Sequence, residues 1–166
     1  MKKYYQSDFT AEQVSAVLDY APLTGLFTYK CKSHRREVGQ LAGRADTKGY
    51  FRIRLFGREF KSHRLSWLLT YGVWPAEEID HKNGVPGDNR LENLREVTTA
   101  ENGQNRRKAQ KNNRSGFLGV SAVGNVFHAQ IKATGTVRHL GSYETADEAH
   151  AAYLAAKREL HSACTI

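Results

Sequence analysis

The fold of this chain is decided by the stretch Glu78-Ile79-Asp80-His81-Lys82-Asn83-Gly84, which places an acid beside a histidine at the end of a predicted short strand. The loop Asp88-Asn89-Arg90-Leu91-Glu92-Asn93-Leu94 follows and leads into a second predicted strand, Arg95-Glu96-Val97. Next comes a capping-box pattern, Thr98-Thr99-Ala100-Glu101, so Asn102 falls in the first turn of a predicted helix. The expected order is strand, long loop, strand and helix.

The side-chain types of Asp80, His81 and Asn102 meet the separate needs of phosphodiester hydrolysis, and a helix laid across a hairpin can bring them together. Cutting a phosphodiester requires an activated water and neutralisation of charge on the phosphate. A carboxylate and an amide oxygen can hold one hard divalent ion, and a neutral histidine can deprotonate the attacking water. An Asp-His pair or a lone Asn is common on protein surfaces, so it is the joint pattern that favours a nuclease.

Composition supports a polyanionic partner. The chain has 166 residues, 40% of them hydrophobic, and a formal net charge of +8. The sequence pI is about 9.6. Charge alone is also compatible with a merely soluble basic protein. Cys31 and Cys164 stand alone, so we expect neither a cysteine-built zinc site nor a disulfide framework, which suits the cytoplasm. No apolar stretch has the length of a membrane span or signal peptide, so we expect no membrane partner.

The region before the Asp-His pair is predicted to contain helices and a hairpin. A capping box at Thr10 predicts a helix over residues 11–20, and residues 25–30 read as a strand. Residues 50–56 alternate basic and apolar side chains and turn back into residues 59–61, while residues 63–71 have helical spacing.

Four basic or titratable residues of this region have two possible roles each. Arg52 and Arg54 lie on one face of the predicted hairpin, where they could touch phosphate, although a solvated strand face is commoner. His63 and Arg64 begin the second helix. A local structural role is the simpler expectation for both, and a supporting contact to the active site is the alternative.

A basic segment follows the predicted nuclease region. Residues 100–115 carry a net charge of +4, half that of the chain, and almost no large apolar side chains. Such a run cannot bury itself in a core, so it is either a solvated linker or a tether along DNA. The clustering favours the tether, with the following candidate DNA contacts: Arg106, Arg107, Lys108, Lys111 and Arg114.

The last fifty residues read as a separate module. Residues 117–121, 126–132 and 137–140 are predicted strands, and a capping box at Thr145 opens a helix to about Leu160. Strand alternation directs one set of side chains toward the helix: Phe127, Ala129, Ile131 and Leu140. The other set faces outward: Ser121, Val123, His128, Gln130, Lys132 and His139. The whole chain is therefore predicted to be α+β.

Spacing around the Asp-His pair resembles that of the HNH homing endonucleases typical of phages and self-splicing introns. Asn93 lies twelve positions after His81, and Asn102 lies nine positions after Asn93. The Gly49-Tyr50 strand and the His63-Arg64-Leu65 helix start also look like this family, so the resemblance covers roughly residues 10 to 110. It implies a ββα-metal (HNH, His-Me finger) core over about residues 77–105 within a domain spanning residues 1–105.

The resemblance also implies roles for individual residues. Asp80 and Asn102 would hold one Mg²⁺ or Mn²⁺ ion, His81 would be the general base, and Asn93 would hold the loop and orient the histidine. The last motif position is Asn102, as in the Asn-ending subgroup, and its neutral oxygen favours magnesium or manganese over zinc. Relatives in this subgroup include nicking enzymes, so we expect one strand to be cut. We also expect the chain to act as a monomer. Two flanking arginines, Arg90 and Arg95, either clamp the phosphate or lie on the surface.

The C-terminal module resembles the Apetala/ethylene-response-factor type of DNA-binding domain. The motifs are Gly119-Val120, Ala129-Gln130-Ile131, Leu140-Gly141 and the Tyr143–Ala149 helix start. The resemblance covers roughly residues 116 to 161, and we assign residues 116–166 to this domain and 106–115 to the linker. It implies a three-stranded antiparallel sheet that lies on DNA with one helix behind it. The arginines and tryptophans of the plant domains are missing from the outward face, so base preference does not carry over, and a simple packing module is the alternative.

The sequence thus predicts a metal-dependent endonuclease acting on double-stranded DNA. Two alternatives remain open. A non-catalytic, sequence-specific DNA-binding regulator would use only the C-terminal sheet. An RNA-cutting or toxin-like nuclease would use the same metal site, since its chemistry acts on phosphate.

Overall fold

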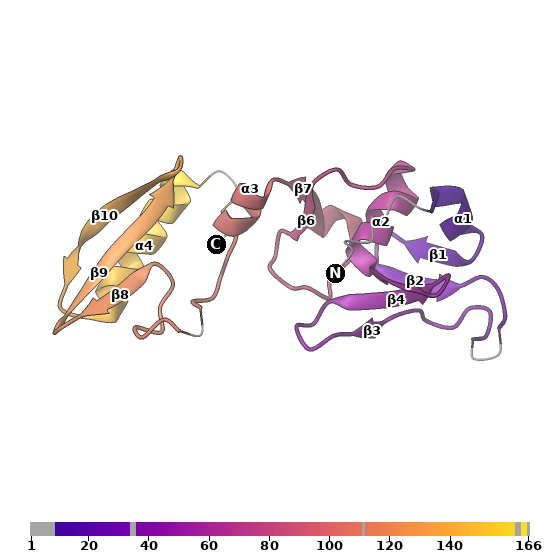
Figure 1. Cartoon of the computed structure of the whole chain (residues 1–166), viewed down its shortest axis with the longest axis horizontal. Coiled ribbons are helices and arrows are strands. Elements are labelled where there is room, and N and C mark those ends of the chain that lie inside the picture. Colours follow the sequence, from indigo (N-terminus) through magenta and orange to yellow (C-terminus); the bar gives the residue numbers. More distant parts are fainter. Residues whose placement is uncertain (1–8, 34–35, 111, 162–163, 166) are drawn as a thin grey trace. The chain divides into compact units, whose positions relative to one another are not determined.

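The computed structural model describes residues 9–33, 36–110, 112–161 and 164–165. The chain divides into two compact units, Met1–Thr98 and Thr99–Ile166 (Figure 1). The division falls just before α3 (Thr99–Gln104), so this helix and the basic segment belong to the second unit. The predicted domain limits at residues 105 and 116, which came from the two resemblances, stay predictions.

The first unit begins with a short helix and a hairpin. Helix α1 (Ala11–Ser15) starts at the predicted capping box, where the Thr10 side chain accepts from the Gln13 backbone nitrogen. Strands β1 (Leu18–Ala21) and β2 (Leu26–Tyr29) then pair antiparallel. The prediction of helix as far as Tyr20 is wrong, because Leu18 and the residues after it pair with β2, a partner that helical spacing alone does not reveal.

A three-stranded sheet and a helix complete the main core. The sheet has the order β3 (Arg44–Ala45), β4 (Phe51–Leu55) and β5 (Arg58–Lys61). Helix α2 (Ser62–Tyr71) begins directly after β5 and ends at Gly72, which has a left-handed conformation. The core is built from the apolar faces of α1, α2 and the strands: Val14, Leu18, Phe27, Ile53, Leu55, Phe60, Leu65 and Leu68.

The stretch that begins at Glu78 forms a second hairpin of the first unit. Strand β6 (Glu78–His81) pairs antiparallel with β7 (Leu94–Val97), and a short 3-10 helix, η2 (Leu91–Asn93), leads into β7. Ile79, Leu94 and Val97 are buried, which anchors both strands. The loop between the strands therefore starts and ends at fixed points.

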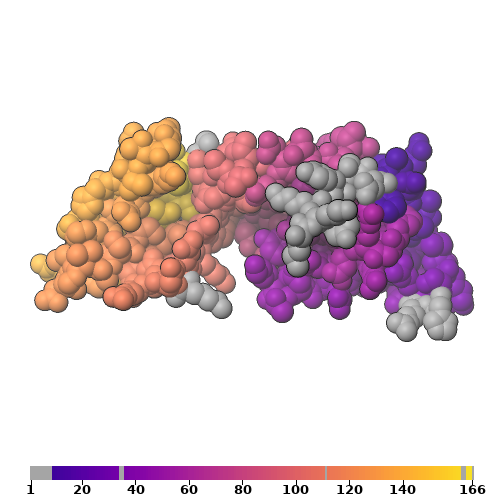
Figure 2. Space-filling model, in the orientation of Figure 1, coloured from indigo at the N-terminus to yellow at the C-terminus, as the bar shows by residue number. Residues whose placement is uncertain are grey.

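In the second unit, helix α4 (Ala146–Leu160) packs on a sheet of order β10-β9-β8. The strands are β8 (Val120–Val123), β9 (Val126–Ala133) and β10 (Thr136–Tyr143). In the view of Figure 2 the orange strands lie in front and the yellow helix shows only in part. The predictions of a mixed α+β fold and of a C-terminal antiparallel sheet packed on one helix are confirmed.

The first strand of this sheet starts three residues later than predicted. The sequence placed a strand over residues 117–121, but β8 begins at Val120. Residues before it form a turn in which Gly119 has φ +78°, and an added Cβ there would meet the Tyr153 ring. The close approach of α4 thus requires glycine and a turn at this point, which strand alternation cannot reveal.

None of the helices in the described ranges has the length and apolar character needed to cross a membrane.

Candidate active site

Asp80 is fixed at the end of β6 by an arginine from the neighbouring strand. Asp80 lies opposite Arg95 in the β6–β7 ladder and is 8% exposed. The Arg95 Nε and Nη2 atoms both donate to the Asp80 Oδ2 atom, at 3.0 and 2.8 Å. This pairing fixes the orientation of the carboxylate, and it engages the Arg95 guanidinium, which the sequence offered as a phosphate clamp.

His81 is buried beside an asparagine that the sequence analysis did not single out. The His81 Nε2 and Asn89 Oδ1 atoms lie 3.3 Å apart. The amide nitrogen of Asn89 donates to the Gly87 carbonyl, which turns its oxygen toward the imidazole. When the proton of the imidazole is on Nε2, this nitrogen donates to the Asn89 Oδ1 atom. The other ring nitrogen, Nδ1, is then the basic one. Burial lowers the pKa of His81, which favours the neutral ring.

Two further aromatic rings surround His81. The His63 ring lies 5.1 Å from the His81 ring, and the Tyr50 ring lies 5.9 Å from it (centroid distances). Burial and repulsion from His81 lower the pKa of His63 to about 3. Of the two readings of His63, this position favours the supporting contact. Arg64 donates to the carbonyls of Glu77 and Pro75, which is a local structural role.

The loop between β6 and β7 is held by Asn93. Its Oδ1 accepts from the Asn83 backbone nitrogen at 3.0 Å, and its Nδ2 donates to the Asp88 carbonyl at 2.8 Å. Its own carbonyl accepts from the Lys82 backbone nitrogen. These bonds fix the loop close to His81, while an effect of Asn93 on the orientation of the histidine stays a prediction.

Arg90 is engaged by two carboxylates of the same loop. Its Nε and Nη2 atoms donate to the two oxygens of Asp88 at 2.9 and 2.8 Å, and its Nη1 donates to Glu92 at 2.8 Å. The guanidinium lowers the pKa of Asp88 to about 2. Arg90 thus stabilises the loop, and its proposed role as a phosphate clamp stays a prediction.

Asn102, the second predicted metal ligand, lies on α3 in the second unit and is partly buried. Asp80, His81, Asn89 and Asn93 lie together in the first unit. The donor types suit a hard cation, because both predicted ligands offer oxygen. No group of three or more His, Cys, Asp or Glu side chains able to hold a metal is found among the described residues. The predicted pair of one carboxylate and one amide does not require such a group.

The predicted DNA contacts of the second unit lie mostly on its surface. In the basic segment, four predicted contacts are exposed: Arg106, Arg107, Lys108 and Arg114. Lys111 lies outside the described residues. On the outward sheet face, Gln130, Lys132 and His139 are exposed, while Ser121 and His128 are partly buried. The opposite face carries Ala129 and Ile131, both buried, as alternation predicts.

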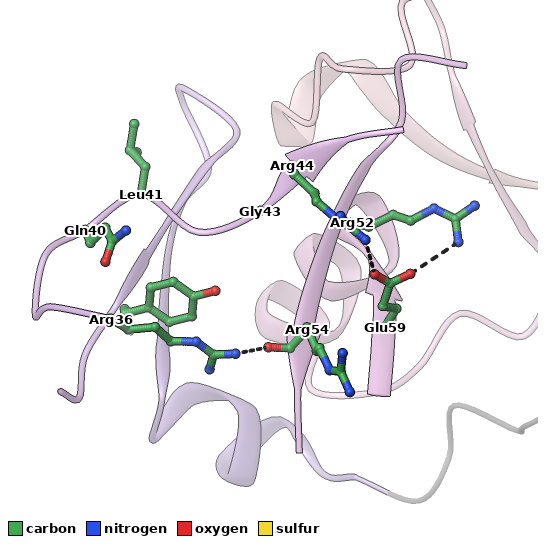
Figure 3. Close-up of a pocket in the computed structure, with 9 residues that line it drawn as sticks. Arg36, Gln40, Leu41, Gly43, Arg44, Arg52, Arg54 and Glu59 are labelled. Carbon is green, nitrogen blue, oxygen red and sulfur yellow. Dashed lines mark hydrogen bonds and ion pairs between the residues drawn. The ribbon is translucent and has the colours of Figure 1, made fainter. Parts of the chain in front are cut away.

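The first unit also contains a cluster of arginines, of which the sequence pattern indicates only two. A cavity of about 250 Å³ lies at the β3–β4–β5 sheet, and its lining includes Arg36, Arg44, Arg52 and Arg54 (Figure 3). Glu59 pairs with Arg44 at 2.9 Å, and Asp46 pairs with Arg52 at 3.0 Å. Alternation along β4 reveals Arg52 and Arg54, but Arg36 and Arg44 join them only through chain folding.

Comparison with known proteins finds similarity for part of the chain. Residues 60–104 match the family of HNH endonucleases. The chain is also similar to a solved structure described as "DNA binding and cleavage by the HNH homing endonuclease I-HmuI", with 28% identity and a TM-score of 0.40. That match covers 54% of this chain and 51% of the other, so the chain spans about half the length of this relative. No match is found among curated proteins.

The family match contains Asp80, His81, Asn93 and Asn102, so the predicted HNH endonuclease segment is confirmed. The Asn-ending subgroup and the Apetala-type resemblance stay predictions. Residues 60–104 of this chain are therefore similar to the HNH endonuclease family.

Proposed function

We propose that this chain is a divalent-metal-dependent endonuclease that hydrolyses one phosphodiester bond in duplex DNA and so nicks one strand. The observation that carries the proposal is the match of residues 60–104 to the HNH endonucleases, with Asp80, His81 and Asn102 inside it. The arrangement of Asp80 and His81 on one strand end is consistent with it.

His81 acts as the general base in this proposal. Because burial lowers its pKa, the imidazole is neutral at physiological pH and can accept a proton from the attacking water. The hydrogen bond with Asn89 selects the tautomer in which Nδ1 is the basic nitrogen. Asn93 acts indirectly, because it holds the loop that carries Asn89.

Asp80 and Asn102 would hold one Mg²⁺ or Mn²⁺ ion. When bound, the ion neutralises charge on the phosphate and on the leaving oxygen. Arg95 holds the Asp80 carboxylate in a defined orientation through its two hydrogen bonds. Oxygen ligands from a carboxylate and an amide favour these hard cations over zinc.

Contact with DNA is proposed to come from positive surfaces on both units. The net charge of +8 favours a polyanion. In the first unit, Arg54 lines the arginine-rich cavity of Figure 3. In the second unit, the exposed residues of the basic segment and of the outward sheet face supply further contacts.

Incubation of the full chain with supercoiled plasmid and Mg²⁺ tests this function. Nicking converts the plasmid to open circles, whereas cutting of both strands yields linear DNA. His81→Ala should abolish cleavage and leave DNA binding largely intact, because only the base is lost. Metal-dependent cleavage by His81→Ala would contradict the mechanism. A footprint without any strand break in the presence of Mg²⁺ would favour a DNA-binding regulator instead, and preferential cutting of structured RNA would favour an RNA nuclease.

A further inference from the structure

The basic segment of the second unit is fixed to helix α4 by a buried lysine. Lys157 is only 1% exposed, and its Nζ atom donates to the Arg106 carbonyl at 2.5 Å. The Nζ atom also lies 5.8 Å from the centre of the Tyr153 ring. A buried ammonium group is costly unless it is hydrogen-bonded, so this side chain ties the backbone at Arg106 to the helix.

Two further sets of bonds hold the same segment. The Arg107 Nη2 atom donates to the carbonyl and hydroxyl oxygens of Thr165, at 3.2 and 2.7 Å. At the other end, the Asn113 amide nitrogen donates to the Phe117 and Val120 carbonyls, at 2.9 and 3.1 Å. The described part of the segment is therefore held to the second unit at both ends, and a course of this segment along DNA stays a prediction.

A cavity of about 450 Å³ lies beside the fixed segment. Arg107, Lys108 and Asn113 form its polar side, while Phe117, Leu118 and His150 form the opposite side. His150 is held by a hydrogen bond between its Nδ1 atom and the Leu118 carbonyl at 2.9 Å, and its ring lies 5.1 Å from that of Phe117. Among the described residues that line this cavity there are two basic side chains and no carboxylate.

The chemistry of this cavity suits an anion that carries a sugar. Its described lining contains the cations of Arg107 and Lys108 and no carboxylate side chain, so it attracts an anion. The apolar wall formed by Phe117 and Leu118 lies beside these cations and suits a sugar attached to that anion.

We propose that this cavity binds a backbone phosphate of the DNA together with its deoxyribose, and that Lys157 is the positioning residue that holds Arg106, Arg107 and Lys108 in place for it. The inference rests on the proposed function only in taking DNA as the polyanion. Because hydrogen bonds hold the backbone at Arg106 and the Arg107 side chain, binding costs less conformational entropy there, which increases affinity.

Fluorescence anisotropy of the full chain with a labelled duplex, without divalent metal, tests the site at several salt concentrations. Each lost phosphate contact lowers the slope of log Kd against log salt by about 0.9. Lys108→Gln should lower the slope by about this amount. Lys157→Met, which keeps the length and removes the charge, should weaken binding by about 3-fold to 10-fold and also lower the slope.

The matched control is Arg158→Met, which removes an exposed charge from the next position of α4 and should leave the slope unchanged. An unchanged slope in both Lys108→Gln and a folded Lys157→Met would overturn the proposal. Circular dichroism checks the folding of Lys157→Met, and if this variant does not fold, Lys108→Gln decides alone, because its side chain is on the surface.

Plasmid cleavage distinguishes this inference from the proposed function. If both hold, Lys157→Met raises KM for DNA and leaves kcat unchanged, because the reacting groups lie elsewhere. DNA binding with the expected slope changes but without cleavage would support the phosphate site and reject the nuclease. If Lys108→Gln and Lys157→Met cleave DNA and show the same kinetics and the same salt slopes as the unaltered chain, the phosphate site is rejected and the nuclease function is retained.

Discussion

At the scale of single residues, the catalytic proposal depends on how Asn89 holds His81. The Asn89 amide is oriented by its bond to the Gly87 carbonyl, so its oxygen faces the His81 Nε2 atom. A histidine that can rotate, or that carries its proton on the other nitrogen, presents its basic lone pair in the wrong place. In the proposed mechanism Asn89 is thus a positioning residue for His81, the proposed base.

Asn89→Leu tests this role, since leucine has a similar volume and no hydrogen-bonding group. We expect kcat for plasmid nicking to fall by about 10-fold to 100-fold, because the tautomer is no longer selected, with little change in KM for DNA. The control is Asn125→Leu in the exposed turn between β8 and β9. Equal kcat values for Asn89→Leu and the unaltered chain would reject the role.

His63 makes the stability of the first unit depend on pH. Its folded pKa is about 3, against an ordinary value of 6.5, because the ring is buried beside His81. Between these two values the unfolded chain binds a proton at position 63 that the folded chain does not. The free energy of unfolding should therefore fall as pH decreases from about 6.5 toward about 3.

His63→Gln should reduce this pH dependence. We expect the melting temperature of the unaltered chain to decrease between about pH 7 and about pH 5, and the variant to show a smaller decrease. His139→Gln, at an exposed position of the other unit, should retain the full decrease. An identical decrease in His63→Gln would show that this histidine is not the source.

At the scale of elements, the turn between β1 and β2 supports the active-site loop. The Leu91 backbone nitrogen donates to the Pro22 carbonyl at 3.0 Å, and the Tyr20 hydroxyl donates to the Asn89 carbonyl at 2.8 Å. Gly25 in this turn has φ +73°, and an added Cβ would lie 2.5 Å from the Arg90 backbone nitrogen. The hairpin at one end of the unit thus fixes the loop that carries Asn89.

Gly25→Ala should therefore displace the loop. We expect a loss of about 3 kcal/mol or more in the free energy of unfolding, from backbone strain and the contact with Arg90, together with reduced nicking. Gly57→Ala is the matched control, because Gly57 has φ +77° and nothing within 4 Å of its added Cβ. It should cost only about 1 kcal/mol. If chemical denaturation gave equal losses in the free energy of unfolding for Gly25→Ala and Gly57→Ala, the contact with Arg90 would not contribute to stability.

At the scale of the whole molecule, the proposed function gives the metal ion and the net charge separate tasks. The net charge of +8 comes from side chains and does not depend on a bound ion. Chelation by EDTA should therefore abolish nicking and leave DNA affinity nearly unchanged, while raising salt from about 50 to about 200 mM should weaken binding strongly. Anisotropy and plasmid assays on the same sample measure both effects. Nicking that persists in EDTA would reject the metal requirement.

Local secondary structure and the HNH segment could be predicted from the sequence without coordinates. Helix starts at Thr10 and Thr145, the β6–β7 hairpin and the C-terminal sheet follow from capping boxes and alternation, which act between near neighbours in the sequence. The spacing from Asp80 to Asn102 likewise predicted the HNH segment that the family match confirms. Local rules and motif spacing suffice for such features, because they involve few residues over a short stretch.

Folding in three dimensions decided which distant residues surround the candidate site and the basic segment. Leu18 belongs to a strand because β2 pairs with it, and His63 meets His81 across the core. Lys157 looks like a surface lysine in the sequence, yet it is buried and holds Arg106 from a distance of 51 positions. These outcomes depend on packing between segments far apart in the chain, and no pattern of neighbouring residues contains that information.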